Sequence, residues 1–179
     1  MKNTNESKAI YRLVMAAMFL ALALCLPFLT GQIPQMGKSL CPMHIPIMLC
    51  GFFCGPWYGL VVGLIAPLLR FLLFGAPAII PEGVAMSLEL ATYGAVIGWL
   101  YILLPKKRMS IYVSLIGAML LGRVIWGMVR TVLLGVAKVP FSFEMFITGG
   151  FVTAIPGILI QIVLIPILVM SLRKYTYES

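Results

Sequence analysis

The chain has 179 residues, of which 62% are hydrophobic and 10% are charged. Soluble domains are closer to half apolar and a quarter charged, so this composition excludes an ordinary soluble protein and indicates an integral membrane protein. The apolar runs are continuous and do not alternate with polar residues, which favours helices over a β-barrel, and about six spans of about 20 residues fit this length. The formal net charge of +8 does not predict nucleic-acid binding, because most Lys and Arg residues lie between the apolar runs.

A polar, basic tail over residues 1–9 precedes the first apolar run. That run has no small-residue cleavage site, so we expect a membrane span and not a signal peptide. Ala17 and Ala21 form a small-xxx-small pair in it, which either serves internal packing or provides a docking face for a partner subunit. The polar stretch 30–41 is long for a helical connection, and we interpret it as an outer lid loop.

Glycine and proline divide the following apolar sequence into further runs. The second run is too short to cross about 30 Å of bilayer as one helix, and Gly55-Pro56 separates it from the third. Gly59 and Gly63 lie on one face of the third run, and Gly94 and Gly98 on one face of the fourth, so both predict close helix packing. We predict an all-α integral membrane protein with a single domain over 1–179. Its six transmembrane helices are expected at residues 10–29, 42–54, 57–74, 83–104, 111–136 and 145–172.

The basic residues are distributed asymmetrically around these spans. With an even number of spans most of them fall on one side of the membrane, which is the positive-inside pattern and predicts that both termini are cytoplasmic. The residues on that side are Lys2, Lys8, Arg12, Lys106, Lys107, Arg108, Arg173 and Lys174, and those on the other side are Lys38 and Lys138.

Five charged residues lie within or beside the predicted spans: Arg70, Glu82, Glu89, Arg123 and Arg130. A charge at the membrane centre costs about 2.5–3.5 kcal/mol, so these residues require ion pairs or a wet cavity. One interpretation is structural: Glu89 pairs with Arg130 or with Arg70 and ties helices together. Arginines outnumber the acids, and a free guanidinium suits a ligand carboxylate or phosphate. By depth, Arg70, Glu89 and Arg130 predict one pocket in the outward half of the membrane.

Three uncharged side chains extend this candidate site. Trp126 shares a face of the fifth span with Arg123 and Arg130, where it either helps to hold an anionic or aromatic solute or packs as core. His44, the only histidine, is either a structural hydrogen-bonding residue or a ligand contact, and Tyr93 follows the buried acid by one helical turn. The predicted substrate-binding residues are Arg70, Glu89, Arg130, Trp126, Arg123, His44, Glu82 and Tyr93.

Catalytic and metal-binding motifs are absent from the sequence. It contains no HExxH, GxSxG or P-loop pattern, and one histidine excludes most acid–base schemes, so we expect neither an enzyme nor a cofactor. Cys50 and Cys54 are spaced for one helix face, but no His or acid joins them there. We interpret the four cysteines as inert buried thiols and expect no metal. Without an ATP site, active transport would need a partner or an ion gradient.

The sequence resembles the substrate-binding S component of energy-coupling factor (ECF) vitamin transporters, in the branch that includes pantothenate-type members. The resemblance rests on about six spans in a chain of this length, the basic N-terminus and the pair Ala17-xxx-Ala21. It also rests on the run HIPIMLCGFFCGPWYGLVVGLIAPLLR, the Pro-rich turn after it and the segment MSLELATYG.

This resemblance implies a multi-pass protein of the bacterial plasma membrane that binds a vitamin from outside with high affinity, beneath the lid at 30–41. It implies association with a transmembrane coupling subunit, through Ala17 and Ala21, and with two cytoplasmic ATPases whose ATP hydrolysis reorients the protein. The expected ligand is pantothenate, whose carboxylate suits a surplus arginine. Glu82 and Glu89 suit a cationic or hydroxyl-rich ligand equally well, so a B6 vitamer, a thiamin precursor and riboflavin are alternative ligands.

Three other classes remain as alternatives. A stand-alone secondary carrier of a small metabolite would take up its substrate without any ATPase. In a membrane scaffold or assembly factor, the arginines would serve only as ion pairs between helices. An intramembrane enzyme is the remaining class.

Overall fold

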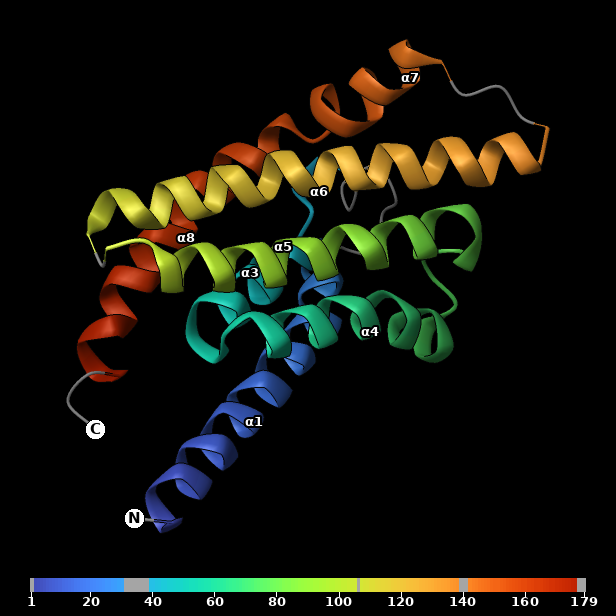
Figure 1. Cartoon of the computed structure of the whole chain (residues 1–179). Helices are drawn as coiled ribbons and strands as arrows, with labels where there is room; N and C mark the ends of the chain where they lie inside the picture. Colours follow the sequence, from blue (N-terminus) through green and yellow to red (C-terminus); the bar gives the residue numbers. More distant parts are fainter. Residues whose placement is uncertain (1, 31–38, 106, 139–141, 177–179) are drawn as a thin grey trace.

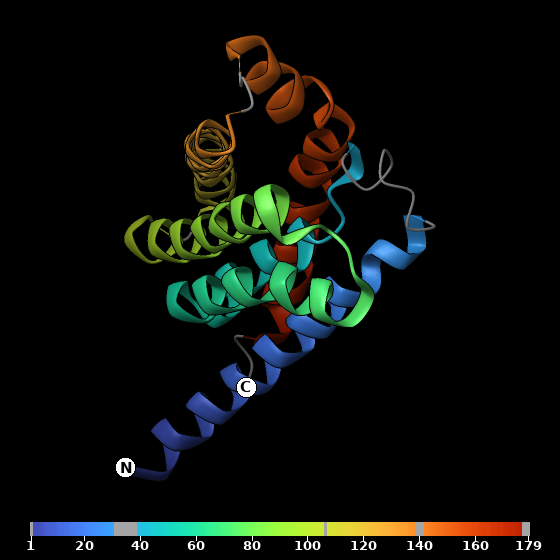
Figure 2. The ribbon, with the colours of Figure 1, turned by 90° about the vertical axis from the view of Figure 1, so that its right-hand side faces the viewer.

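The computed structural model describes residues 2–30, 39–105, 107–138 and 142–176, and in these residues the chain is helical with no strand. The helix α5 lies in the middle of the bundle between α4 and α6, as Figure 1 shows. Behind α5 lies α3, with α1 on one side and α8 on the other, which is clearer in Figure 2. The bounds are α1 Lys2–Cys25, α3 His44–Cys54, α4 Pro56–Phe74, α5 Val84–Leu103, α6 Arg108–Val136 and α8 Ile155–Thr176.

Short helical segments within the described residues connect or extend these helices. A 3₁₀ segment continues α1, and a π-helical segment leads into α5. Before α8 come a five-residue α-helix and a second π-helical segment. The bounds are η1 Leu26–Thr30, η2 Ile79–Gly83, α7 Phe143–Ile147 and η3 Thr148–Val152.

Among the described residues, five helices are long and apolar enough to cross a membrane. They are Glu6–Leu29, Pro56–Phe74, Ile79–Leu103, Arg108–Val136 and Ile155–Leu172. The helix α3 has 11 residues, so it extends only about 16 Å and does not cross a bilayer alone. The all-helical membrane fold is therefore confirmed, whereas six full spans are not. Both termini lie toward the same end of the bundle (Figure 1).

Two predicted segments differ from the structure. The predicted polar tail 1–9 is helical from Lys2 onward, as the beginning of α1. The predicted span 145–172 is divided, because α7 and η3 precede a break and α8 begins at Ile155. Pro156 lies in the first turn of α8, where its missing N–H removes no helical hydrogen bond. Residues 31–38, which form most of the predicted lid, lie outside the described residues.

The helices α4 and α5 approach each other through glycine. A Cβ atom placed on Gly59 would lie 2.7 Å from the carbonyl oxygen of Gly94, and one placed on Gly63 would collide with the backbone of Leu90. A side chain at these positions would push the two helices apart, so the predicted close packing of the glycine faces is confirmed. Gly55 has a φ of 95°, which an L side chain rarely adopts, and it separates α3 from α4.

The apolar core surrounds α3 and α5. Its residues come from α1, α3, α4, α5, α6 and α8, whereas the outward faces of α1, α4 and α6 carry exposed apolar side chains suited to lipid. Polar side chains that point inward from α3 and α5 are consequently enclosed on all sides. Core residues with 0% exposure include Ile47, Met48, Leu90, Ile97, Leu115 and Ile165.

Candidate functional site

Glu89 is the most enclosed charge of the predicted site. It lies on α5 with 2% of its surface exposed. Arg123 of α6 places Nη1 3.0 Å from its Oε1 atom, and the Tyr93 hydroxyl donates to the same oxygen at 2.7 Å. Tyr93 is one turn further along α5, and its ring occupies the space that a side chain at Gly122 would need. The carboxylate is therefore matched by one guanidinium and one hydroxyl.

His44 faces this carboxylate from the first residue of α3. Its side chain is buried, with Nε2 3.8 Å from Oε1 of Glu89, which is beyond hydrogen-bond distance. Its ring centroid lies 5.5 Å from that of Tyr93. Neither ring nitrogen has a hydrogen-bond partner within the part of the chain that the structure describes. Leaving a buried polar group unsatisfied costs about 1–3 kcal/mol, and both ring nitrogens of His44 remain available for a hydrogen bond to a ligand.

Cys41 and Gln161 complete the group on the side of α8. Arg123 directs Nη2 to the Cys41 sulfur at 3.9 Å, and Gln161 donates from Nε2 to the Cys41 carbonyl at 3.4 Å. Burial raises the pKa of the Cys41 thiol, while the positive charge of Arg123 acts in the opposite direction. The sequence analysis did not select these two residues; a glutamine inside an apolar span was the available signal for one of them. We name His44, Glu89, Tyr93, Arg123, Cys41 and Gln161 the central cluster.

A second ion pair lies further along α6. Arg130 places Nη1 2.6 Å from Oε2 of Glu82, and these side chains are 21% and 26% exposed. The guanidinium carbon of Arg130 lies 4.9 Å from the centre of the Trp126 ring, close enough for a cation–π interaction. Trp126 is itself buried against Phe146 of α7. Trp126 therefore lies on the same face of α6 as Arg130.

Arg70 has a different environment from the other charges. It is buried near the end of α4, where Nη1 donates to the carbonyl of Leu24 at 2.9 Å. Its guanidinium carbon lies 5.5 Å from the ring centres of Phe28 and Phe74. Because Leu24 is in the last turn of α1, this bond satisfies a carbonyl at the negative end of the helix dipole.

The predicted ion pairs of Glu89 are wrong. Glu89 pairs with Arg123, and Arg130 pairs with Glu82. Neither the Glu89–Arg130 nor the Glu89–Arg70 pair forms, because Arg70 turns toward α1 instead. The structure thus gathers four predicted residues in the central cluster, three around the Glu82–Arg130 pair, and one at the α1–α4 contact.

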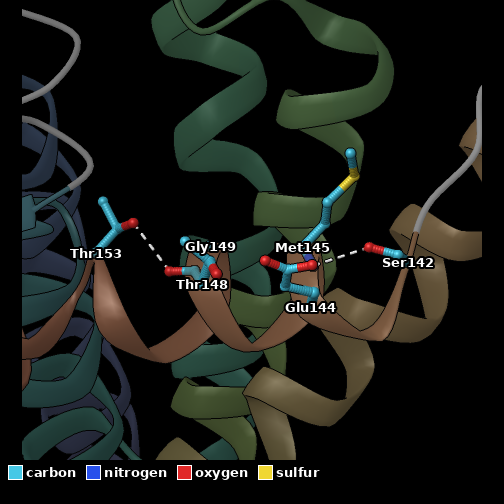
Figure 3. Close-up of a pocket in the computed structure, with 6 residues that line it drawn as sticks. All are labelled: Ser142, Glu144, Met145, Thr148, Gly149 and Thr153. Carbon is cyan, nitrogen blue, oxygen red and sulfur yellow. Dashed lines mark hydrogen bonds between the residues drawn. The ribbon is translucent and has the colours of Figure 1, made fainter.

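A surface hollow lies at α7 and η3 (Figure 3). Its volume is about 400 Å³, and it is widely open. None of the eight predicted substrate-binding residues lines it, so it differs from the hollow predicted among the charges. Of its lining residues, Gly149 adjoins Trp126, since a Cβ placed there would lie 3.2 Å from the indole. The lining residues are Ser142, Glu144, Met145, Thr148, Gly149 and Thr153.

The arrangement provides hydrogen bonds and paired charges, which are means of binding. Within the described ranges, no three His, Cys, Asp or Glu side chains lie close enough together to hold a metal ion. Apolar spanning helices around a buried polar cluster define a multi-pass membrane protein with an interior polar site.

Comparison with known families specifies this class further. Residues 11–169 match the family described as the ECF transporter, substrate-specific component. The chain belongs to this family, whose members are transporter subunits with a vitamin- or micronutrient-binding role, a small-molecule substrate and membrane-bound partners. The predicted family is thereby confirmed, and the pantothenate-type branch stays a prediction. No curated protein and no solved structure gives a significant match to the chain.

Proposed function

We propose that this protein binds a vitamin, with pantothenate as the first candidate, outside the bacterial plasma membrane and delivers it inside as part of an ECF-type importer. The observation that carries the proposal is the central cluster, in which Glu89 and Arg123 are buried among apolar helices beside the unsatisfied His44. Charged groups at this depth are costly, and a ligand site is a common reason for them.

Ligand recognition is assigned mainly to the central cluster. Its carboxylate, phenol, guanidinium and imidazole suit a small ligand with several hydroxyl and amide groups. Glu82, Trp126 and Arg130 would contact the part of the ligand nearer the outside. Pantothenate has two hydroxyls, an amide and a carboxylate, which fit these groups. A B6 vitamer, a thiamin precursor and riboflavin offer related groups and remain the alternatives.

Calorimetric titration of the purified protein tests this proposal. We expect saturable binding of pantothenate, weakened by about 100-fold in Arg123→Met because the ligand site loses its central charge pair. The matched control is Glu144→Gln in the hollow at α7 and η3, which should bind as the unsubstituted protein does. Binding of pyridoxine, a thiamin precursor or riboflavin without pantothenate would remove pantothenate, and no binding of any of them would remove the vitamin proposal.

Energy coupling is assigned to partners. The proposed partners are a transmembrane coupling subunit and two cytoplasmic ATPases, which act on a protein whose termini are both cytoplasmic. Ala17 and Ala21 are exposed on α1, the least enclosed of the candidate spans, which supports a docking face there. Small residues allow the backbone of another helix to come close in a membrane.

A stand-alone secondary carrier is the second candidate function. It shares the buried charges, since ion-coupled carriers also use ionisable residues within the membrane. Vesicles that contain this chain alone distinguish the two functions. Uptake driven by an ion gradient without any ATPase would favour the carrier, and uptake only with the coupling subunit and ATP would favour the importer.

A further inference from the structure

We propose that the central cluster binds an uncharged hydroxyl or amide group of the ligand between His44 and Glu89, and that the anionic group of the ligand stays outside the cluster. This inference rests on the function proposed above and names the chemical group that the same site recognises. The composition of the chain favoured the opposite arrangement, in which a free guanidinium holds a ligand carboxylate.

The first argument is that the charges of the site are already balanced within the protein. Arg123 is 3.0 Å from Glu89, and Arg130 is 2.6 Å from Glu82. The remaining candidate, Arg70, donates to the carbonyl of Leu24 and lies against two aromatic rings. The surplus guanidinium inferred from composition is therefore directed toward α1 and not toward Glu89.

The second argument concerns the repulsion that a second anion would meet. A ligand carboxylate in the central cluster would lie beside Glu89 and compete with it for Arg123. Two like charges a few ångströms apart in an apolar interior repel strongly, because little solvent screens them. An uncharged polar group has no such penalty and leaves the Glu89–Arg123 pair intact.

The third argument is the geometry of His44. Its side chain is 4% exposed, and neither ring nitrogen has a hydrogen-bond partner within the described residues. Nε2 is 3.8 Å from Oε1 of Glu89, so a ligand oxygen that accepts a hydrogen bond from Nε2 lies within reach of this carboxylate. A neutral imidazole can donate one hydrogen bond, and a hydroxyl both accepts and donates. A ligand hydroxyl can thus accept from His44 and donate to the Glu89 carboxylate.

Glu89 has the capacity for this additional bond. A carboxylate accepts at about four lone-pair sites, and Tyr93 and Arg123 account for two contacts, both at Oε1. An amide NH would serve as donor to Glu89 equally well, with its carbonyl as the acceptor. The cluster therefore matches the neutral, hydroxyl- or amide-bearing part of a vitamin.

Paired ligands that differ only in charge test the inference. Calorimetry compares pantothenate with pantothenol, in which CH₂OH replaces the carboxylate, and pyridoxine with its carboxylate analogue pyridoxate. In the pair that binds, we expect the dissociation constant of the uncharged member to be lower than that of the anionic member, or at most about fivefold higher. An uncharged member that binds more than about 100-fold more weakly would overturn the inference and leave vitamin binding intact.

The same experiment separates this inference from the choice of vitamin. If only the pyridoxine pair binds, the pantothenate proposal fails and the charge preference within that pair decides the inference. If none of the four compounds binds, the pantothenate proposal and this inference both fail, whereas the vitamin proposal fails only if the thiamin precursor and riboflavin also do not bind.

Variants of His44 test its contact with the uncharged probe. We expect His44→Phe to weaken binding by about 10- to 100-fold and His44→Gln to retain most of the affinity, because an amide still forms the hydrogen bond. The matched control is Ser114→Ala, which removes another buried polar group without a described hydrogen-bond partner, nine residues before Arg123 on α6. It should leave the affinity unchanged.

The melting temperature without ligand separates binding from a structural role of His44. Replacing a buried, unsatisfied polar group by an apolar one is nearly neutral or stabilising, so His44→Phe should not lower it. Unchanged affinity in His44→Phe would overturn the inference. A lowered melting temperature with equal loss of affinity in His44→Phe and His44→Gln would also overturn it, because it would assign His44 to the framework.

Discussion

Glu89 and Arg123 form a buried ion pair in which the side chains are 2% and 8% exposed. Each is buried, and each would be an uncompensated charge in an apolar surrounding without the other. The desolvation penalty of such a pair is large, so its net contribution to stability is small, whereas the loss of one member is severe. The pair therefore specifies how α5 and α6 meet at the site.

Breaking this pair should destabilise the protein more than removing it. We expect Glu89→Gln to lower the free energy of unfolding by about 3–5 kcal/mol, because Arg123 stays buried without a counter-charge. The double variant Glu89→Gln/Arg123→Met should recover a large part of this loss. Unfolding of the detergent-solubilised variants measures both effects, and strictly additive single effects would contradict the coupling.

Arg70 is predicted to act in stability and not in ligand binding. Arg70→Met removes the hydrogen bond to Leu24 and the contacts with Phe28 and Phe74, which together predict a loss of about 1–3 kcal/mol. The ligand affinity should stay unchanged in the same calorimetric assay. A loss of affinity comparable to that of Arg123→Met would instead place Arg70 in the ligand site, as the composition of the chain predicted.

At the scale of elements, the glycine faces of α4 and α5 bring these two helices into close contact. Their backbones touch through Gly59 and Gly94, so the close approach depends on the missing side chains. This contact positions α5, which carries Glu89 and Tyr93. Packing between α4 and α5 is therefore a condition for the geometry of the central cluster.

A methyl group at Gly94 should disturb this contact. The added Cβ would overlap the backbone of Gly59, and overpacking of this kind costs about 1–3 kcal/mol. The matched control is Gly135→Ala on α6, where the added Cβ meets nothing within 4 Å. Thermal unfolding should show a lower melting temperature for Gly94→Ala and an unchanged or higher one for Gly135→Ala, and equal melting temperatures would refute the packing argument.

The exposed face of α1 is expected to serve transport and not ligand binding. Ala17→Trp or Ala21→Trp should leave the affinity for ligand unchanged and abolish ATP-dependent uptake, because the indole prevents close approach of the coupling subunit. The control Val113→Trp changes a position on α6 that is 51% exposed and should retain uptake. Loss of ligand binding with intact assembly would show that the docking face was assigned incorrectly.

At the scale of the whole molecule, an even number of membrane crossings requires that α3 complete one of them. Five helices have the length of a span, and α3 runs back between α1 and α4 with only 11 residues. Its residues are mostly buried by neighbouring helices, so the backbone near its ends is shielded from lipid by protein. This arrangement allows both termini to lie toward one end of the bundle (Figure 1).

Reporter tags test the orientation of the chain. The positive-inside pattern predicts that tags fused to the N- and C-terminus are both inaccessible from outside intact cells. A tag inserted after Lys138, just beyond the C-terminal end of α6, should be accessible from outside. Accessibility of only one terminal tag would mean an odd number of crossings and would contradict the proposed topology.

The identity of the spans and of the charged residues followed from local properties of the chain. Apolar run length, Gly55-Pro56 and the glycine spacing are read within one or two helical turns, and the structure places α4, α5 and α6 close to the predicted bounds. The break in the predicted span 145–172 lies next to Pro156, since η3 ends at Val152 and α8 begins at Ile155.

Composition, apolar run length and motif resemblance were sufficient for the membrane class and the transporter family, because they depend on the transfer of side chains to lipid and on short segments of sequence. The partners of the charges were decided only by tertiary structure. The sequence offered Arg70 and Arg130 as partners of Glu89, but the close packing of α5 against α6 brought Arg123 to it, while the end of α1 engaged Arg70. Such choices depend on contacts between residues far apart in the sequence, which no local pattern encodes.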